Sequence, residues 1–369
     1  MLKTCTIQDV VTNRLDPRVD SVKWLAGIVG ENPSKYAKSP SIWNPVLQAL
    51  SLDASYLPFD VEAKQLASFV EAARHEERLK GFSVTMPYKV AILPLLDELD
   101  PKARSIGAVN VVVRTGEGKL IGANTDGSGG LASLSQPVSG EPGPFMPDLT
   151  NKNVLLIGAG GAGKALAWYL ADAIGEGTIY VANRSQSSGN ELCRALRPVN
   201  PRTVWLGEST IESVAPSVQL IINATTKGQS GLRTCPDGSV TCLEPYSALA
   251  PATPATFSAT VAADGPRFHE AWFRASWPDV MDNLARSART LSCIAPSVRV
   301  MDIVYAPLET PLLKQARLSG HRTLNGKGMN ICQAADALFH WVFRDHFEAA
   351  GRYEPAQYRA IVDRMCAVW

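Results

Sequence analysis

The chain has 369 residues, 46% of them hydrophobic, and a formal net charge of +1 at pH 7. This length predicts two domains with buried cores, and the near-neutral charge argues against a nucleic-acid or membrane partner. The five histidines and seven cysteines are scattered and show no metal-ligand spacing. There is no signal-peptide core and no apolar run of about 18 residues. We therefore expect a cytoplasmic protein that binds no metal.

The first part of the chain alternates between apolar runs and amphipathic segments. The apolar runs predict strands at residues 22–30, 54–60, 81–89 (with a proline-marked loop at its end), 108–113 and 119–122. The amphipathic segments predict helices at 41–50 and 63–78, the first preceded by Ser39 as a cap and Pro40 at the first helical position. This alternation is typical of an α/β domain, which we place at about residues 20–130.

Residues 153–182 predict a strand–helix–strand unit around a glycine-rich turn. An apolar strand at 153–157 leads directly into Gly158-Ala-Gly160-Gly161-Ala162-Gly163, and an apolar helix follows. Glycines at this spacing permit a tight turn, the close approach of a pyrophosphate and close packing of helix on strand. The free N–H groups at the start of the helix attract phosphates. We therefore predict that Gly158, Gly160, Gly161, Ala162 and Gly163 bind a dinucleotide in a Rossmann-type domain.

The end of the second strand indicates which dinucleotide binds. NAD sites usually carry an acid there, about 20 residues after the glycines. Here the strand ends in Asn183-Arg184-Ser185, and no acid lies between Glu176 and Glu191. An arginine can pair with a 2′-phosphate through two hydrogen bonds. These residues therefore favour NADP over NAD.

The rest of the second domain continues the same pattern. An apolar strand at residues 220–225 ends in Thr225, at the edge where an open α/β sheet binds its ligands. The sheet resumes at 298–305 and has a last strand at 322–325. We therefore place a doubly wound, dinucleotide-binding domain at about residues 151–326.

Two segments do not belong to this strand pattern. Residues 229–297 contain a stretch rich in Pro, Ala and Thr and then a helical piece. We expect this segment to be an insertion outside the core, and it shows no chemistry of its own. The helices predicted at 331–347 and 355–368 have no strand to follow, so we predict that residues 331–369 return to complete the first domain.

Several short motifs occur in the order typical of one enzyme family. Before the glycine turn they are Ser39-Pro40 with Asn44, Val84-Thr85-Met86-Pro87-Tyr88-Lys89, Ile106-Gly107-Ala108-Val109-Asn110 and Asn124-Thr125-Asp126-Gly127. After it they are Asn183-Arg184-Ser185, Asn223-Ala224-Thr225, Asp302-Ile303-Val304-Tyr305-Ala306-Pro307, and Gly328-Met329 with Gln333. With these motifs the chain resembles the shikimate/quinate dehydrogenase family over most of residues 22–345.

The resemblance implies an oxidoreductase of aromatic amino acid biosynthesis that interconverts a ring ketone and alcohol. The family's usual pair is 3-dehydroshikimate and shikimate with NADP, and some members use quinate, sometimes with NAD. By resemblance, Lys89 and Asp126 are the catalytic pair. Hydride delivery to a carbonyl builds negative charge on its oxygen, which a lysine ammonium can stabilise by donating a proton. Asp126 would hold Lys89 in place and bind a ring hydroxyl.

The resemblance also implies a pocket for a hydroxylated ring carboxylic acid. Its substrate-binding residues would be Ser39, Thr85, Asn110, Tyr305 and Gln333. Gly328 matches a family glycine near the nicotinamide. A polyhydroxylated ring needs hydroxyl and amide partners because an unpaired buried hydroxyl is costly.

Three positions depart from the family pattern. The loop for the substrate carboxylate usually reads His-Ser-x-Ser-Pro, and Ala37 replaces its first serine here. Losing one charge-assisted hydrogen bond costs roughly ten- to a hundredfold in affinity. Ser83 and Val111 stand where the family often has Asn and Thr. This pattern suggests preserved redox chemistry on shikimate, quinate or a modified relative.

Two other classes of function fit parts of the sequence. A catalytically inactive regulator or binding protein could use the same fold, although such a protein has no need for intact Lys89 and Asp126. Another two-domain α/β dehydrogenase, such as the methylenetetrahydrofolate type, would need a catalytic lysine in a motif that we do not find. The sequence is compatible with a monomer or a homodimer.

Overall fold

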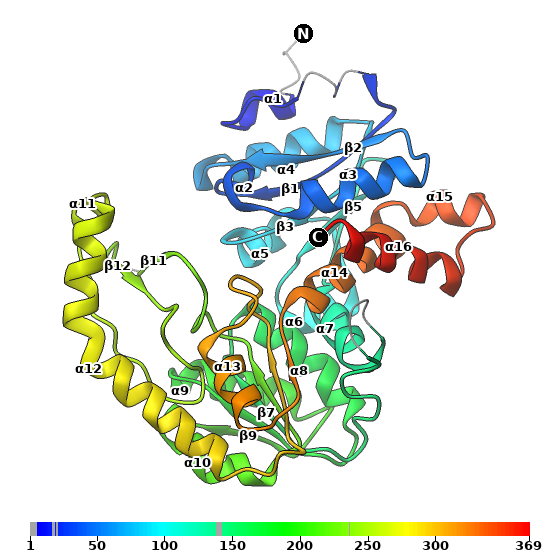
Figure 1. Ribbon diagram of the computed structural model, residues 1–369. Coiled ribbons are helices and arrows are strands. Elements are labelled where there is room, and N and C mark those ends of the chain that lie inside the picture. Colours follow the sequence, from blue (N-terminus) through cyan, green and yellow to red (C-terminus); the bar gives the residue numbers. More distant parts are fainter. Residues whose placement is uncertain (1–5, 17–18, 20, 138–141, 236) are drawn as a thin grey trace. The chain divides into compact units, whose positions relative to one another are not determined.

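The structure is a computed structural model that describes residues 6–16, 19, 21–137, 142–235 and 237–369. The chain forms two compact units. The first contains Met1–Pro144 and Gly328–Trp369, and the second contains Phe145–Lys327. Each unit has a six-stranded sheet with helices packed on it (Figure 1). This arrangement confirms the predicted α/β fold class.

The sheet of the first unit is mixed and has the strand order β2-β1-β3-β5-β6-β4. Its strands are β1 (Trp24–Gly30), β2 (Ala54–Asp60), β3 (Leu79–Val84), β4 (Glu98–Leu99), β5 (Val111–Arg114) and β6 (Leu120–Ala123). Strand β1 pairs in parallel with β2 and β3, whereas β5 runs antiparallel to β3 and β6. The side chains of β1 are almost all buried, as expected for a strand covered on both faces.

Helices from both ends of the chain pack on this sheet. They are α1 (Ile7–Val10), α2 (Pro33–Tyr36), α3 (Ser39–Ala49), α4 (Leu66–His75), α5 (Tyr88–Ala91), α6 (Pro101–Ile106), α7 (Asp126–Ser135), α14 (Lys327–Asp336), α15 (Arg344–Ala349) and α16 (Pro355–Ala367). Ile331, Leu338 and Ile361 from the C-terminal segment share one buried cluster with Trp43 and Val46 of α3. The C-terminal helices therefore contribute to the core of the first unit.

Two predicted helices differ in detail from those in the structure. The helix expected at 331–347 is interrupted by a π-helical segment, Ala337–Val342, which lies between α14 and α15. Ser39 is the first residue of α3 rather than its cap, and Lys38 occupies the cap position without a side-chain hydrogen bond. Helix ends are the least certain part of any sequence-based prediction, because capping choices one residue apart are similar in free energy.

One glycine allows α7 and α14 to touch. A Cβ atom on Gly129 would lie 2.4 Å from the backbone nitrogen of Gln333, which is closer than real Cβ contacts. Only glycine therefore permits this approach. The contact brings Gln333 next to the start of α7, although some 200 residues separate the two in sequence.

The sheet of the second unit is entirely parallel, with the order β14-β13-β10-β7-β8-β9. Its strands are β7 (Val154–Ile157), β8 (Ile179–Ala182), β9 (Thr203–Leu206), β10 (Leu220–Asn223), β13 (Arg299–Asp302) and β14 (Thr323–Leu324). The chain builds outward from β7 to β9 and then returns to β10 on the other side of β7. This reversal creates the switch point at which doubly wound sheets bind their ligands.

The helices of the second unit include a long one in the segment predicted to be an insertion. They are α8 (Gly161–Ala173), α9 (Gln186–Leu196), α10 (Ile211–Val214), α11 (Ala259–Ala262), α12 (Gly265–Ser292) and α13 (Pro311–Leu318). A small antiparallel hairpin, β11 (Leu232–Thr234) with β12 (Val240–Cys242), precedes α11. Figure 1 shows α12 as the long yellow helix.

The expectation that residues 229–297 lie outside the core is wrong in part. Strands β10 and β13 are parallel neighbours, so the chain between them must cross over, and α12 is the long helix of this crossover. Leu291 at its end and Ile294 just beyond are buried in the same cluster as Ile221 and Val300 of the sheet. Its N-terminal half belongs to a separate cluster with the hairpin.

A buried carboxylate joins the ends of β10 and β13. Asp302 accepts hydrogen bonds from Asn223 Nδ2 (2.9 Å), the backbone N–H of Val304 (3.0 Å) and Thr310 Oγ1 (2.7 Å). Burial raises the pKa of the Asp302 carboxyl from its ordinary value of 3.8 to about 6, against the opposing effect of these three donors. Ionisation of Asp302 is therefore less favourable in the folded protein than in the unfolded chain.

The raised pKa of Asp302 predicts a pH dependence of stability. Between pH 4 and 6 the unfolded chain loses this proton while the folded protein keeps it, so the free energy of unfolding should fall as pH rises. A shift of about two pKa units corresponds to roughly 3 kcal/mol. The Asp302→Asn variant should lack this contribution. Urea unfolding of both proteins at pH 4, 5, 6 and 7 measures it, and parallel pH profiles would contradict the assignment.

Candidate active site

Lys89 and Asp126 form an ion pair in the first unit. Lys89 lies in the short helix α5 that follows β3, and Asp126 is the first residue of α7. Lys89 Nζ donates to Asp126 Oδ2 at 2.6 Å, and the two side chains are 24% and 9% exposed. The N-terminus of α7 favours a negative charge at Asp126. The pair is thus partly shielded from water but leaves the ammonium accessible.

Asn110 fixes the other oxygen of Asp126. Its amide nitrogen Nδ2 donates to Asp126 Oδ1 at 2.9 Å, and its Oδ1 accepts the backbone N–H of Thr125 at 2.7 Å. The backbone N–H of Asp126 donates to Asn124 Oδ1 at 3.0 Å. Asn110 and Asp126 are both buried. Asn110, just before β5, therefore orients the carboxylate of Asp126, and Asn124, just after β6, holds its backbone.

Gln333 joins this network from the C-terminal segment. Its Oε1 accepts from Asn110 Nδ2 at 3.3 Å, and its backbone oxygen accepts from Thr125 Oγ1 at 3.0 Å. The two N–H groups of the Asn110 amide also have Asp126 and Thr125 Oγ1 as acceptors. The bond to Gln333 is the longest of the three, so it is the one that a ligand hydroxyl can most readily replace. Lys89, Asp126, Asn110 and Gln333 form one connected polar cluster.

Ser39 and Thr85 lie elsewhere in the same unit. Ser39 begins α3 and hydrogen bonds to the buried hydroxyl of Tyr56, which also donates to Ser83 Oγ at 2.8 Å. Burial raises the pKa of Tyr56. Thr85 follows β3, and its backbone N–H donates to Val29 at 2.9 Å. Tyr56 was missed in the sequence, because a tyrosine in a predicted strand gives no signal that its hydroxyl joins two serines.

Ala37 and Val111 are two of the three residues that depart from the family pattern. Ala37 is the residue after α2, and its backbone N–H donates to Pro33 at 2.9 Å. Val111 is fully buried in β5. Val111 therefore belongs to the hydrophobic core of the first unit.

Two predicted site residues lie in a different unit from the residues with which they were grouped: Tyr305 from the other substrate-binding residues, and Gly328 from the other cofactor-binding residues. Tyr305 belongs to the second unit, three residues after β13, and burial raises the pKa of its phenol. Gly328 belongs to the first unit, where it is buried in the first turn of α14. The polar cluster described above belongs to the first unit alone.

The glycine turn of the second unit has the geometry of a phosphate cradle. Gly158 follows β7 with a φ of 108°, a value that favours glycine, and α8 begins at Gly161. A Cβ on Gly163 would lie 2.1 Å from the Gly158 oxygen, so helix and strand pack closely only with glycine there. A Cβ on Gly160 or Gly161 would meet no protein atom within 4 Å. The space above these two glycines, with Ala162 beside them, therefore suits a bound pyrophosphate.

The loop after β8 supports this turn. Asn183 Oδ1 accepts the backbone N–H of Ala159 at 3.1 Å, and its Nδ2 donates to the Ser185 oxygen at 2.8 Å. Ser185 caps α9 by accepting the backbone N–H of Ser188. Arg184 lies between these two residues and is exposed. Asn183 and Ser185 thus fix the conformation of the loop, and the exposed guanidinium of Arg184 lies between them.

Thr225 lies at the end of β10, next to the same turn. Its Oγ1 donates to Asn223 Oδ1 at 2.7 Å, and a Cβ on Gly158 would come within 2.9 Å of its Cγ2. The loops after β7, β8 and β10 therefore meet at the carboxyl ends of the strands. This is the edge at which doubly wound sheets bind nucleotides.

A buried ion pair near Arg184 was missed in the sequence. Lys227 Nζ donates to Glu208 Oε2 at 2.9 Å and to the backbone oxygen of Ala250 at 2.8 Å. Burial lowers the pKa of Lys227, and the positive charge of Arg184 acts in the same direction. The separation of these residues in sequence hides the pair, because no local spacing relates them.

The described part of the chain lacks both a metal-binding cluster and a membrane-spanning helix. Among its residues, no group of three or more His, Cys, Asp or Glu side chains could hold a metal ion. No helix within the described ranges is sufficiently long and apolar to cross a membrane.

Comparisons with known proteins relate both units to one family. A family model described as the shikimate dehydrogenase substrate binding domain matches residues 28–112. A model described as shikimate / quinate 5-dehydrogenase matches residues 144–233.

Similar whole proteins agree with the family models. Shikimate dehydrogenase (NADP(+)) of Geobacter metallireducens is 33% identical over 321 residues, which cover 86% of this chain and 90% of that protein. The crystal structure of shikimate 5-dehydrogenase from Listeria monocytogenes in complex with shikimate and NAD matches with 25% identity and a TM-score of 0.66, covering 92% of this chain and 99% of that one. Quinate dehydrogenase from Corynebacterium glutamicum in complex with NAD matches with 25% identity and a TM-score of 0.64, covering 94% and 98%. The chain therefore belongs to the shikimate dehydrogenase family.

Proposed function

We propose that the protein is an NADP-dependent dehydrogenase that interconverts a ring ketone and alcohol of the 3-dehydroshikimate/shikimate or quinate type. The observation that carries this proposal is the Lys89–Asp126 ion pair, held by Asn110 in a cluster lined with amide and hydroxyl groups. The name of the Geobacter relative and the ligands of the Listeria structure support the same reaction and substrate class. An inactive binding protein would not need a lysine that is held in place but remains accessible.

The chemistry follows from the charges in the cluster. NADPH, when bound, supplies a hydride to the carbonyl carbon of the ring ketone. Negative charge then develops on the carbonyl oxygen, and Lys89 donates a proton to it from its ammonium group. Asp126 holds Lys89 Nζ and accepts a hydrogen bond from a neighbouring ring hydroxyl. In the oxidative direction Lys89 takes up the proton of the alcohol.

The glycine turn and Arg184 support NADP as the cofactor. Gly158, Gly160, Gly161, Ala162 and Gly163 would bind the pyrophosphate, with Thr225 beside them. Arg184 would pair with the 2′-phosphate of the adenine ribose. Asn183 and Ser185 would hold the arginine loop, and Gly328 would lie near the nicotinamide. NAD lacks the 2′-phosphate and is therefore the less favoured cofactor.

The substrate is a hydroxylated ring carboxylic acid. Asn110, Gln333 and Thr85 would bind its hydroxyls, and Ser39 its carboxylate, with Tyr305 as a further substrate contact. Ala37 removes one hydroxyl that the family usually offers to the carboxylate. We place the enzyme in the cytoplasm, because the seven cysteines are scattered along the sequence without a disulfide framework, as is usual in a reducing compartment.

The direct test is an assay of the purified protein with shikimate, quinate and related ring acids, with NADP⁺ or NAD⁺, followed by the absorbance of reduced nicotinamide. Absence of turnover with every acid and both cofactors would contradict the proposed function.

Replacing Lys89 tests the proton donor. Lys89→Ala should lower kcat by roughly two to four orders of magnitude, the usual effect of losing general acid–base catalysis. The Kd for NADP⁺ should stay near that of the wild type, and adding Asp126→Ala should cost little more, because the two groups act jointly. Lys64→Ala, at an exposed lysine of the same unit, is the control and should leave kcat unchanged. Equal, additive losses from the two substitutions would argue against a joint role.

Replacing Arg184 tests the cofactor. Arg184→Ala should raise the KM for NADP⁺ at least roughly tenfold, because a two-bond contact with the 2′-phosphate is lost. The KM for NAD⁺ should barely change. Arg194→Ala in α9 removes an exposed arginine nearby and serves as the matched control. Similar losses with both cofactors would assign Arg184 a structural role.

Replacing Ala37 tests the substrate. If the missing hydroxyl has moved the preference away from shikimate, Ala37→Ser should raise kcat/KM for shikimate several-fold or more, since it restores a hydrogen bond to a charged group. Steady-state kinetics with shikimate and quinate measure the change. An efficient wild type that gains nothing from the serine would identify an ordinary shikimate dehydrogenase with a variant loop.

A further inference from the structure

Lys227 and Glu208 form a buried ion pair that the proposed reaction does not use. Lys227 Nζ donates to Glu208 Oε2 at 2.9 Å, and each side chain is 10% exposed. Lysine and glutamate are rarely buried to this extent unless they are paired. Apolar residues in place of a buried ion pair often leave stability unchanged or improve it, so stability alone does not account for the pair.

The pair connects the loops on both sides of the proposed nucleotide site. Glu208 comes two residues after β9, and Lys227 comes four residues after β10. In the sheet order β10-β7-β8-β9, the strands β7 and β8 lie between these two strands. The glycine turn follows β7, and the loop with Arg184 follows β8. The Lys227–Glu208 contact therefore joins the two loops that flank the proposed binding sites for the pyrophosphate and the 2′-phosphate.

The strand register places Glu208 at the same edge of the sheet as Arg184. Strands β8 and β9 pair in parallel, with Ala182 opposite Leu206. Arg184 and Glu208 each come two residues beyond this paired position. The charges of Arg184 and Glu208 both act on Lys227. The proposed 2′-phosphate ligand and the Glu208 carboxylate are therefore neighbours of one lysine.

The backbone of Lys227 is fixed by the residues at the end of β10. Its N–H donates to Thr225 Oγ1 at 3.1 Å, and its oxygen accepts from Asn223 Nδ2 at 3.1 Å. Asn223 Oδ1 in turn accepts the backbone N–H of Thr225 at 2.8 Å. The loop that carries Lys227 therefore has a defined conformation at the carboxyl end of the strand.

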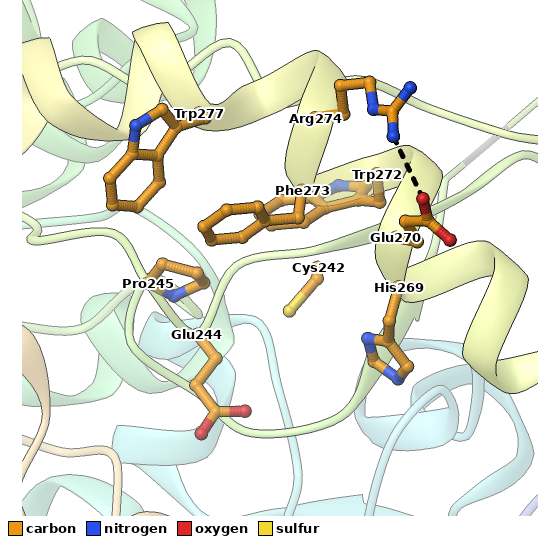
Figure 2. Close-up of a pocket in the computed structure, with 9 residues that line it drawn as sticks. All are labelled: Cys242, Glu244, Pro245, His269, Glu270, Trp272, Phe273, Arg274 and Trp277. Atoms are coloured by element: carbon orange, nitrogen blue, oxygen red, sulfur yellow. Dashed lines mark hydrogen bonds and ion pairs between the residues drawn. The ribbon is translucent and has the colours of Figure 1, made fainter.

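The ammonium has a second acceptor that is also fixed. Lys227 Nζ donates to the Ala250 oxygen at 2.8 Å, and Asn283 Nδ2 of α12 donates to the same oxygen at 3.0 Å. Figure 2 shows Glu244 and Pro245, which come earlier in this segment, lining one groove with the aromatic side chains of α12. The segment is therefore anchored to α12, and its carbonyl helps to hold the ammonium in place.

Without the lysine, the Glu208 carboxylate would oppose binding of a 2′-phosphate. A carboxylate at this edge favours NAD, because it accepts a hydrogen bond from the ribose 2′-hydroxyl and repels a phosphate. It would also compete with the phosphate for Arg184. A second acid that acts on Lys227, Asp279, accepts hydrogen bonds from Thr253 at 2.8 and 2.6 Å. Glu208 is therefore the carboxylate that Lys227 neutralises by direct contact.

We propose that Lys227 determines cofactor specificity: it holds the Glu208 carboxylate away from Arg184, so that the 2′-phosphate of NADP can bind to the arginine. This role rests on the proposed NADP-dependent function. Lys227 acts through Glu208 and Arg184 and not on the reacting atoms, so it is a positioning residue. The two partners of the ion pair should therefore have opposite effects on the binding of a 2′-phosphate.

Binding of 2′,5′-ADP and 5′-AMP, which differ only in the 2′-phosphate, tests this role. Isothermal titration calorimetry of the full chain measures both Kd values. Lys227→Met should raise the Kd for 2′,5′-ADP at least roughly tenfold, because the unpaired carboxylate then competes for Arg184. The Kd for 5′-AMP should change less than about twofold. Glu208→Gln should lower the Kd for 2′,5′-ADP several-fold, since it leaves an unpaired cation near the phosphate.

A double variant and a matched control separate this role from a structural one. Lys227→Met combined with Glu208→Gln removes both charges and should recover most of the wild-type Kd for 2′,5′-ADP. Lys314→Met, at an exposed lysine of α13, removes a positive charge from the same unit and should leave both Kd values unchanged. Equal losses for the two ligands, or weaker binding of 2′,5′-ADP by both single variants, would overturn the proposal.

Two further outcomes are distinguished by the same titrations. Far-ultraviolet circular dichroism identifies variants that fold correctly. If Lys227→Met does not fold, Glu208→Gln still tests the proposal, because a structural ion pair predicts weaker binding where the specificity role predicts tighter binding. A wild type that binds 2′,5′-ADP no more tightly than 5′-AMP would contradict the proposed NADP dependence, on which the role of Lys227 rests.

Discussion

The arrangement of the candidate active site depends on the position of one buried residue, Asn110. The backbone N–H of Asn110 donates to Ala123 at 3.1 Å, and its carbonyl accepts from Val84 at 2.7 Å. These bonds tie the residue to the ends of β3 and β6, so the sheet itself sets the direction of the Asn110 side chain. That side chain in turn orients Asp126, which holds Lys89. The Lys89 ammonium is therefore positioned by backbone ladder bonds as well as by its own flexible chain.

The predictions from sequence were most accurate where local pattern determines structure. Apolar runs identified the strands of both sheets except β4 and β9, and the glycine spacing identified the turn between β7 and α8. The start of α7 gave no such signal, because Gly127, Gly129 and Gly130 disfavour a helix in isolation. Its close contact with Gln333 explains these glycines, and a contact across some 200 residues cannot be derived from local spacing.

The same reasoning separates the candidate residues that were predicted from the sequence from those that were missed. Lys89 and Asp126 were predicted to act as a pair because each lies in a recognisable motif, and the structure brings the two side chains together. Tyr56 and the Lys227–Glu208 pair were missed because their partners come from distant segments, and burial alone gives them meaning. The role of α12 was missed for a topological reason. A sequence does not reveal that β10 and β13 are parallel neighbours, and only that pairing requires a crossover helix.

The contact between Lys227 and Ala250 limits how this chain can be shortened. Removing residues 229–297 as one block would delete the carbonyl that Lys227 binds and leave a buried ammonium with fewer partners. It would also remove the covering of β10 and β13 supplied by Leu249 and Leu291. A minimal version of the protein must therefore keep the C-terminal turns of α12 and a substitute for residue 250. The hairpin and the aromatic half of the helix form a cluster of their own and can be trimmed separately.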